Sequence, residues 1–393
     1  MERLGDYHSL VKQDPLKALS RLPFLTKQII RDNFELLKSR DLQSRRWFYN
    51  TSGGSTGEPV RFIQDEVYHV YCQSLKRHYD RWTGYEVGMP KVVLWGSERD
   101  LLLGKETLRT RVGRWLRNEL WLNAFRMSEE DLDQYVAIIN KVKPVQILAY
   151  AQAIYELARH VEEKKLVIWS PRAIMTTAGT LHVHMREVIE RVFGAPVFNR
   201  YGSREVGDIA CECEAHEGLH ICPFTHYVEI VREDGTPAEP GEVGEVVVTS
   251  LVNYAMPLIR YRIGDMAAWA DEKCRCGRAW PLLKEVTGRV TDMFVSASGT
   301  RVYGGYFTRL LYFRDWVKKF QFVQESHTHI LLRVVPAVSL EQAKRIAEQE
   351  HAELEDKVRL VMGPACKLEI EFVDDIPPSS SGKYRYTISK VHT

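Results

Sequence analysis

Residues 128–181, SEEDLDQYVAIINKVKPVQILAYAQAIYELARHVEEKKLVIWSPRAIMTTAGTL, decide the fold class of this chain. Ser128 and Asp131 form a capping box, which predicts the start of a helix. Helical and strand patterns then alternate in the order helix, strand, helix, strand: residues 132–142, 145–150, 154–161 and 173–177. Strands separated by helices predict a parallel sheet with both faces covered, and therefore an α/β fold.

The alternation continues beyond this stretch. Residues 185–193 predict a third helix, which Gly194 ends, and residues 196–198 predict a further strand. In open parallel sheets, ligands bind outside the carboxyl ends of the strands. Because the loops 177–180 and 199–203 follow two of these strands, we expect them at the ligand-binding edge.

Two other patterns follow downstream. Short strands with Gly and Pro turns, from about residue 207, predict a β-rich subdomain. A small α+β unit is predicted near the C-terminus, in this order: strands 320–323 and 330–335, a helix from 339 to about 360, and strand 367–373. We expect a large N-terminal domain over residues 1–288, whose β-rich subdomain covers about 207–287, and a small mobile C-terminal domain over 289–393.

Length and charge limit the class of protein. At 393 residues the chain is too long for one ordinary core. Its net charge of +2 gives no overall field that would attract nucleic acid or a membrane surface. One local basic cluster is interpreted as a solvated helix face: Arg109, Arg111, Arg114 and Arg117. The sequence has neither a signal peptide nor an apolar run that could span a bilayer, so we expect a cytoplasmic protein without membrane insertion.

A loop rich in glycine and hydroxyl residues follows the apolar run 47–49. It reads Thr51-Ser52-Gly53-Gly54-Ser55-Thr56-Gly57-Glu58-Pro59. Glycines allow the backbone to approach a ligand closely, and the amide and hydroxyl groups can donate to phosphate oxygens. It is not a Walker loop, because no Gly-Lys-Ser/Thr ends it. Taken alone, a loop of this composition favours a flexible surface turn.

Five of the seven cysteines lie in one third of the chain: Cys211, Cys213, Cys222, Cys274 and Cys276. Residues 210–214 and 218–222 predict two strands joined by a turn, and residues 274–276 form a Cys-x-Cys knuckle. If the turn pairs Cys213 with His220, it also pairs Cys211 with Cys222. Three thiolates and one imidazole would make a closed, structural zinc site. The alternative is a set of buried, reduced thiols that pack as small apolar groups.

Taken together, five segments resemble the adenylate-forming superfamily, specifically its phenylacetate–CoA ligase-like branch, which includes CapK-type proteins. They are residues 51–59, Tyr201-Gly202-Ser203-Arg204-Glu205, Tyr261-Arg262-Ile263-Gly264-Asp265, Gly288-Arg289-Val290-Thr291-Asp292 and Ser381-Gly382-Lys383. The resemblance implies that the protein is an AMP-forming ligase. Such an enzyme activates a small carboxylic acid with ATP and passes the acyl group to coenzyme A.

The resemblance also implies roles for individual residues. The glycine-rich loop would hold the departing pyrophosphate through Thr51, Ser52, Gly53, Ser55, Thr56 and Gly57. The nucleotide would lie against Gly179, Thr180, Tyr201, Gly202 and Ser203. Asp265 would bind the ribose, Arg289 the ribose or the α-phosphate, and Glu205 the Mg²⁺ ion. Lys383 would stabilise charge on the transferring group.

Some members of this family carry a similar Cys/His and Cys-x-Cys pair. The resemblance therefore assigns the zinc ligands as Cys213, His220, Cys274 and Cys276, with His216 as the alternative nitrogen ligand. Trp95, Phe125 and Tyr150 are candidates for lining the acyl pocket. The sequence departs from the family pattern at Glu58, where the loop often has Lys, and at Ala151, where Pro is usual.

Other functions remain compatible with the sequence. The acyl acceptor in a CapK-type ligase would be an amine or a polysaccharide precursor, and an adenylyltransferase would transfer the adenylyl group itself. A nucleotide-binding scaffold without turnover is the alternative outside the enzymes. Neither the carboxylic acid nor the oligomeric state follows from the sequence, and a homodimer is one possibility.

Overall fold

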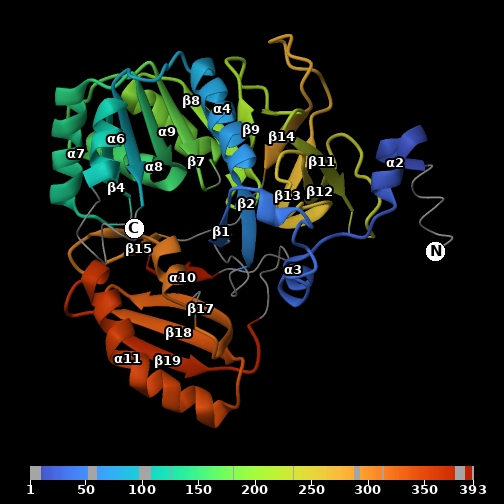
Figure 1. Ribbon diagram of the computed structural model, residues 1–393. Helices are drawn as coiled ribbons and strands as arrows, with labels where there is room; N and C mark the ends of the chain where they lie inside the picture. The colour runs from blue at the N-terminus through green and yellow to red at the C-terminus, as the bar shows by residue number, and fades with distance from the viewer. Residues whose placement is uncertain are drawn as a thin grey trace.

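The computed structural model describes most of the chain (Figure 1). The described residues are 10–51, 60–96, 108–124, 126–179, 181–232, 234–286, 293–311, 314–376 and 386–391.

The largest element of the fold is a sheet of 11 described strands in the order β11-β12-β13-β14-β10-β9-β8-β7-β6-β3-β4. One half is parallel and consists of β3 (Lys91–Trp95), β4 (Glu119–Asn123), β6 (Gln146–Tyr150), β7 (Ala173–Thr177) and the start of β8 (Val197–Ser203). The other half is antiparallel and consists of β9 (Gly207–Glu212), β10 (Leu219–Ile221), β11 (His226–Val231), β12 (Val243–Ser250), β13 (Tyr261–Trp269) and β14 (Leu282–Val286).

Three helices accompany the parallel half, as predicted: α7 (Glu129–Val142), α8 (Ala151–Glu163) and α9 (Val183–Phe193) (Figure 1). In addition, α6 (Leu108–Leu116) contacts β4, and α4 (Glu66–Trp82) contacts β9 and the hairpin strand β2. The capping box of Ser128 and Asp131 is present at the start of α7, and Gly194 ends α9 in the left-handed conformation with a φ of 62°. The prediction of alternating strands and helices in residues 128–198 is confirmed.

Strand β8 joins the two halves of the sheet. Its first residues pair in parallel with β7, up to Asn199, and its later residues pair antiparallel with β9, from Arg200 onward. The β-rich subdomain therefore continues the parallel sheet instead of forming a separate layer. The predicted ligand loop 199–203 lies on this junction.

The N-terminal elements lie beside the antiparallel half (Figure 1). They are α2 (Pro15–Ser20), α3 (Lys27–Asp32), a 3₁₀ turn (Leu42–Ser44) and the hairpin of β1 (Trp47–Thr51) and β2 (Arg61–Asp65). Leu25 forms a bridge with Tyr261 of β13, and Ile30, Phe62 and Ile63 share one buried cluster with this half of the sheet. The hairpin is thereby fixed against the β-rich half.

The C-terminal part is an α+β unit, as predicted. Its sheet has the order β19-β18-β17-β20, from β17 (Val317–Ser326), β18 (His329–Pro336), β19 (Lys367–Phe372) and β20 (Thr387–Ser389). It also contains α10 (Gly305–Leu311) and α11 (Leu340–Met362), and the Ser339 side chain caps α11.

A small sheet connects this unit to the rest of the molecule. Strands β15 (Met293–Val295) and β16 (Arg301–Tyr303) pair with each other, and β16 pairs with β5 (Arg126–Met127). Because β5 follows β4 closely, the C-terminal part is attached at the carboxyl ends of the parallel strands. The predicted boundary at residue 288 lies outside the described residues and stays a prediction.

Candidate functional site

The turn between β8 and β9 and the strand β13 bring together the predicted nucleotide residues. The Tyr201 hydroxyl donates to Oδ2 of Asp265 at 2.9 Å. The Tyr261 hydroxyl donates to Oε1 of Glu205 at 3.4 Å, and both of these side chains are buried. Two pairs that are 64 and 56 residues apart in sequence are therefore in contact. Tyr261 belongs to one of the five family-like segments, but its contact with Glu205 has no signal in the sequence.

The β1–β2 hairpin places the ends of the glycine-rich loop next to this turn. Thr51 ends β1 opposite Arg61, and Gln64 of β2 donates through Nε2 to the carbonyl oxygens of Arg204, at 2.9 Å, and Glu205, at 3.2 Å. Gln64 is itself buried and accepts a hydrogen bond from Asn50. The hairpin that carries the loop is thus hydrogen-bonded to the backbone of the predicted magnesium ligand.

The carboxyl ends of the parallel strands carry further predicted site residues. The rings of Trp95, at the end of β3, and Tyr150, at the end of β6, lie 4.4 Å apart. Gly179 follows β7, after Ala178 with its positive φ of 62°. Trp95 and Tyr150, which were predicted for the acyl pocket, therefore share one edge of the sheet with Gly179.

Gly202 and Ser203 shape the turn itself. A Cβ atom on Gly202 would lie 2.6 Å from the carbonyl oxygen of Gly207 and 2.8 Å from Cα of Asp208. Only glycine fits there, because β8 and β9 approach each other at an irregularity in their register. Ser203 accepts a hydrogen bond from the amide of Val206 at 3.4 Å. Both residues thus have structural roles in holding the turn that carries Glu205.

A buried histidine, which the sequence analysis missed, supports the same turn. Nε2 of His226 lies 2.7 Å from the carbonyl oxygen of Val206 and so donates to it, while Nδ1 accepts from the Thr225 hydroxyl at 2.9 Å. Burial lowers the pKa of His226 to about 4, although the contact with Val206 acts in the opposite direction. The ring is therefore neutral at neutral pH.

Several predicted site residues lie outside the described residues. They are Ser52, Gly53, Ser55, Thr56, Gly57, Thr180, Arg289 and Lys383, together with Glu58 and Phe125. Their predicted roles stay predictions.

The four predicted metal ligands form a compact cluster. Sγ of Cys213, Cys274 and Cys276 and a ring nitrogen of His220 all lie within 4.8 Å of one another. The Cys213 and Cys274 sulfurs are 3.6 Å apart, and Nε2 of His220 is 3.3 Å from Sγ of Cys276. Ligand atoms around a tetrahedral zinc ion would be about 3.6–3.8 Å apart. The donor set and its spacing therefore fit Zn²⁺.

Local hydrogen bonds in the cluster favour the thiolate at Cys276, whereas burial raises the pKa of Cys213 and that of Cys274. The amide of Ala215 donates to Cys213 Sγ, and the amide of Arg278 donates to Cys276 Sγ, each at 3.4 Å. Burial alone would raise the pKa of Cys276, but the backbone and side chain of Arg278 hold it below its ordinary value. Thiolates are the form in which cysteine binds zinc.

The strand register differs from the expected one. Opposite His220 on β9 lies Cys211 and not Cys213, so the register is shifted by two residues, and Cys222 lies near Ile209. A shift of two keeps the same faces, and Cys213 reaches the cluster from beyond the end of the strand. Cys211 and Cys222 pack with Tyr79 and Met175 in a buried apolar cluster.

His216 lies outside the metal cluster. Its Nδ1 atom is 3.3 Å from Oε2 of Glu212, and its ring lies against Phe198, with 4.7 Å between ring centroids. Of the two histidines considered, only His220 belongs to the group of four.

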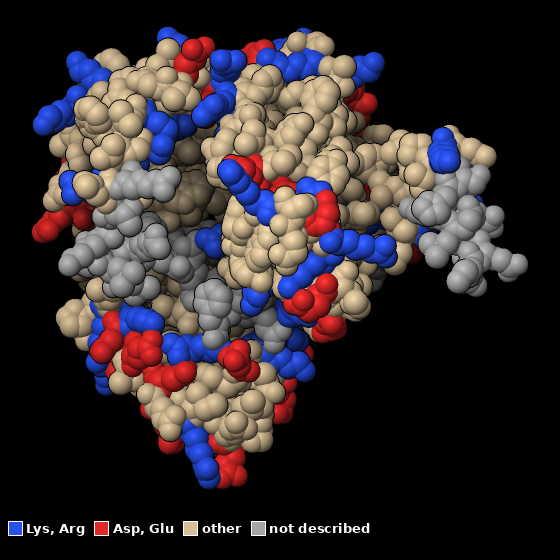
Figure 2. Space-filling model, viewed as in Figure 1, with Lys and Arg blue, Asp and Glu red and all other residues tan. Residues whose placement is uncertain are grey.

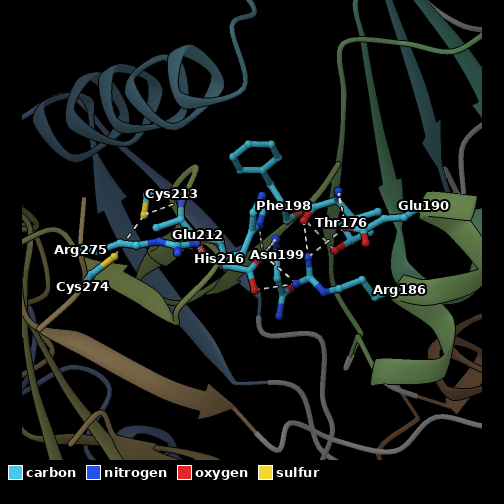
Figure 3. Close-up of polar contacts among 12 residues, drawn as sticks. Thr176, Arg186, Glu190, Phe198, Asn199, Glu212, Cys213, His216, Cys274 and Arg275 are labelled. Carbon is cyan, nitrogen blue, oxygen red and sulfur yellow. Dashed lines mark hydrogen bonds and ion pairs between the residues drawn. The ribbon is translucent and has the colours of Figure 1, made fainter. Parts of the chain in front are cut away.

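A buried ion pair, also missed by the sequence analysis, links the metal cluster to β8 (Figure 3). Arg186 of α9 donates through Nη2 to both carboxylate oxygens of Glu212, at 2.6 and 2.8 Å. Oε2 of Glu212 also accepts from the amide of Asn199 at 2.8 Å. Burial acts to raise the pKa of Glu212, but His216, Arg186 and Asn199 outweigh it and the pKa is lowered. Glu212 is one residue before Cys213. One short segment therefore contributes to the ion pair with Arg186 and to the predicted metal cluster.

Side chains replace a missing strand along this part of β8. On the edge that faces away from β7, the Val197 amide donates to Oε1 of Glu190 at 3.0 Å, and the Val197 carbonyl accepts from Arg186. Pairing with β9 begins only at Arg200. Arg186, Glu190 and Glu212 thus satisfy backbone groups that would otherwise be unpaired just before Tyr201.

Comparisons with known proteins identify relatives of this chain. Residues 294–390 match the CapK C-terminal domain. The chain is 25% identical to Protein CapK of Staphylococcus aureus over 98% of this chain and 85% of that protein. It is 35% identical to a phenylacetate-coenzyme A ligase of Thermus thermophilus, over 77% of this chain and 69% of that protein. A crystal structure of 2-hydroxyisobutyryl-CoA ligase in complex with 2-HIB-AMP and CoA shares the fold, with a TM-score of 0.62, 19% identity, and coverage of 95% of this chain and 82% of that chain.

Proposed function

The chain belongs to the adenylate-forming enzymes, in the branch of the phenylacetate–CoA ligases and CapK-type proteins, and from this premise we propose its reaction. It activates a small carboxylic acid with ATP and then transfers the acyl group to coenzyme A. In the first step a carboxylate oxygen attacks the α-phosphorus, the bond to the bridging oxygen breaks, and pyrophosphate leaves. In the second step the coenzyme A sulfur attacks the acyl carbon, AMP leaves, and the thiol proton is released.

One observation carries this proposal. Tyr201, Glu205 and Asp265 come from two distant segments and meet beside the hairpin that holds the ends of the glycine-rich loop. We take Asp265 as the carboxylate for the ribose and Glu205 as the carboxylate for a divalent cation. The edge lined by Trp95 and Tyr150 provides an apolar wall for an acid.

Each described residue has a role in this proposal. Asp265, which now accepts from Tyr201, would accept the ribose hydroxyls, and the Tyr201 ring would lie beside the adenine. Glu205 would hold Mg²⁺, which neutralises charge on the phosphates when bound. Tyr261 and the carbonyl contacts from Gln64 fix the position of Glu205 before the nucleotide enters.

Lys383 is proposed as the residue that stabilises charge at the α-phosphate and the carboxylate. Lys383→Ala should abolish adenylation and leave ATP affinity largely unchanged. Lys390→Ala, which removes a lysine that pairs with Glu325 on the exposed side of β20, is the matched control and should retain activity. Activity that survives in Lys383→Ala would contradict this assignment.

The deciding experiment is ATP–pyrophosphate exchange with a panel of aromatic and aliphatic carboxylic acids. Exchange that depends on one class of acid, followed by thioester formation with coenzyme A, is the expected result. Glu205→Gln should abolish exchange, and Glu272→Gln, at an exposed site, should not. Bound ATP without exchange for any acid would support the nucleotide-binding scaffold instead.

A second acceptor is favoured by the match to Protein CapK, which extends over nearly the whole chain and includes the C-terminal part. In this variant the acyl group passes to an amine or a polysaccharide precursor. The mass of the product separates the alternatives, because only adenylyl transfer leaves AMP on the product. If the coenzyme A thioester forms at the same rate as pyrophosphate exchange, both the amine or polysaccharide acceptor and adenylyl transfer would be excluded.

For the cluster of Cys213, His220, Cys274 and Cys276, the proposed ligand is one structural zinc ion. Four protein ligands leave no coordination position for water, so the ion would stabilise the fold and take no part in the reaction. It would fix β10 and the segment that follows β9 to the knuckle at residues 274–276.

A further inference from the structure

Helix α6 carries its apolar side chains on the surface. The exposed fractions are 75% for Leu108, 46% for Val112, 77% for Trp115 and 67% for Leu116. With about 100° between successive residues of a helix, these four lie within an arc of about 100°. They form one continuous apolar stripe, and a stripe of this kind normally faces the core of a globular protein.

The opposite side of α6 faces the protein. The helix lies beside β4, the last strand of the large sheet, at the side of the molecule that also carries α7 (Figure 1). The guanidinium of Arg114 lies 4.0 Å from the centre of the Trp121 ring of β4, and Arg114 and Gly113 are partly buried. The helix therefore meets the sheet through Gly113 and Arg114, while Thr110 and the apolar stripe are exposed.

Basic residues border the stripe. By helical position, Arg111 lies on one flank of the arc and residue 109, also an arginine, lies on the other. Arg111 is exposed and α6 contains no acidic residue, whereas Arg117, directly after the helix, pairs with Glu119 at 3.3 Å. Figure 2 shows Lys and Arg atoms around the upper left of the molecule, where Figure 1 places α6 and α7.

Two partners could cover this surface: a second copy of the chain or an anionic lipid bilayer. The positive charge beside the stripe favours the bilayer. In a symmetric contact with a second copy, the same patch would face itself, and the arginines of both helices would meet. Like charges at such a contact oppose association. An anionic lipid surface instead accepts the apolar stripe between its headgroups and pairs its phosphates with the arginines on the flanks.

We propose that α6 is an interfacial helix, through which the enzyme binds reversibly to the surface of an anionic phospholipid bilayer. Trp115, Leu116, Val112 and Leu108 enter the headgroup region, and the exposed Arg111 stays at the level of the phosphates. Among the described helices, none is long and apolar enough to cross a bilayer, so the contact lies on one leaflet. A single short helix gives weak binding, which suits an enzyme that exchanges between membrane and solution.

The test is co-sedimentation of the full chain with vesicles of phosphatidylcholine alone and of phosphatidylcholine mixed with phosphatidylglycerol. We expect binding to the mixed vesicles only, and a loss of binding at high salt. Trp115→Ser should weaken partitioning about tenfold or more, because a large apolar side chain no longer enters the interface. Arg111→Gln should weaken it about fivefold.

The matched control is Leu36→Ser, which changes an equally exposed apolar residue (83%) away from α6. It should leave partitioning unchanged. Thermal unfolding of each variant checks the fold, and Trp115→Ser should unfold like the parent because its side chain is mostly exposed. Absence of binding to mixed vesicles, or equal loss in Leu36→Ser, would overturn the proposal. Dimerisation in sedimentation velocity that Trp115→Ser abolishes would identify a second copy as the occupant and would also overturn it.

Discussion

Glu212→Gln is the substitution that tests most sharply how the fold holds strand β8. The glutamine has the same shape but replaces one acceptor oxygen with an NH₂ donor. In the structure the carboxylate receives hydrogen bonds from Arg186 Nη2 at 2.6 and 2.8 Å and from the Asn199 amide at 2.8 Å. At least one of these donors would lose its partner, and the Arg186 charge would lose its counterion.

The size of the effect follows from burial. Breaking a buried ion pair on one side costs about 3–5 kcal/mol. The Glu212 side chain is only 8% exposed, but that of Arg186 is 24% exposed and also lies 3.5 Å from Glu190. Water and Glu190 would therefore partly stabilise the Arg186 charge in the variant. We expect a loss of unfolding free energy at the lower end of this range, about 3 kcal/mol.

The assay is urea unfolding of the parent, Glu212→Gln, Arg186→Met and the double variant. A coupling free energy of about 2 kcal/mol is expected between the two positions, because each side chain mainly serves the other. Glu190→Gln is the matched control. Its carboxylate is 37% exposed and also binds a β8 amide, so it should cost less than about 1 kcal/mol.

Acid should reduce the difference in unfolding free energy between the parent and Glu212→Gln. The pKa of Glu212 is below its ordinary value of 4.5 in the folded chain. Its contribution is therefore complete above pH 4.5 and is lost as the pH falls through the folded pKa. A parent and variant of equal stability at pH 7, or costs that simply add in the double variant, would refute the role given to this ion pair.

Three further predictions concern the same region. Cys274→Ser should lower zinc content from one ion per chain, as measured by elemental analysis of protein purified without chelators; a zinc-free parent would refute the metal site. Because burial lowers the pKa of His226 from 6.5 to about 4, the parent should lose about 3 kcal/mol of stability between pH 6.5 and 4; unfolding of His226→Asn should lack this dependence. Gly202→Ala should destabilise the fold by about 1–3 kcal/mol in thermal unfolding, because its Cβ would lie 2.6 Å from a carbonyl oxygen; Gly179→Ala, with its nearest contact at 3.8 Å, is the control.

Predictions that depended on neighbouring residues were confirmed. The Ser128–Asp131 capping box, the left-handed Gly194 and the Ser339 cap lie at the ends of the helices that they were expected to bound. The same holds for the alternation of strands and helices, because the hydrophobic period of each segment is a local property. The four residues that the family resemblance assigned as zinc ligands also lie within reach of one another in the structure.

Predictions that depended on strand register were less accurate. The hairpin of β9 and β10 differs by two residues from the expected pairing, because turn geometry sets the register and the cysteine pattern repeats on the same face after such a shift. The exposure of the apolar stripe of α6 was also not predicted. Its period predicts an amphipathic helix, but the side that meets the sheet is decided by Arg114 and Trp121.

The α/β class, the C-terminal α+β unit and the set of motifs could be read from the amino-acid sequence, since these depend on residues close together in the chain. That the two halves of the large sheet meet in β8, and that Tyr261 contacts Glu205 across 56 residues, became visible in the folded chain alone. The same is true of the ion pair of Arg186 and Glu212. Arg186 and Glu212 bind backbone groups of β8 that would otherwise be buried without partners, and that need exists only once the strands are assembled.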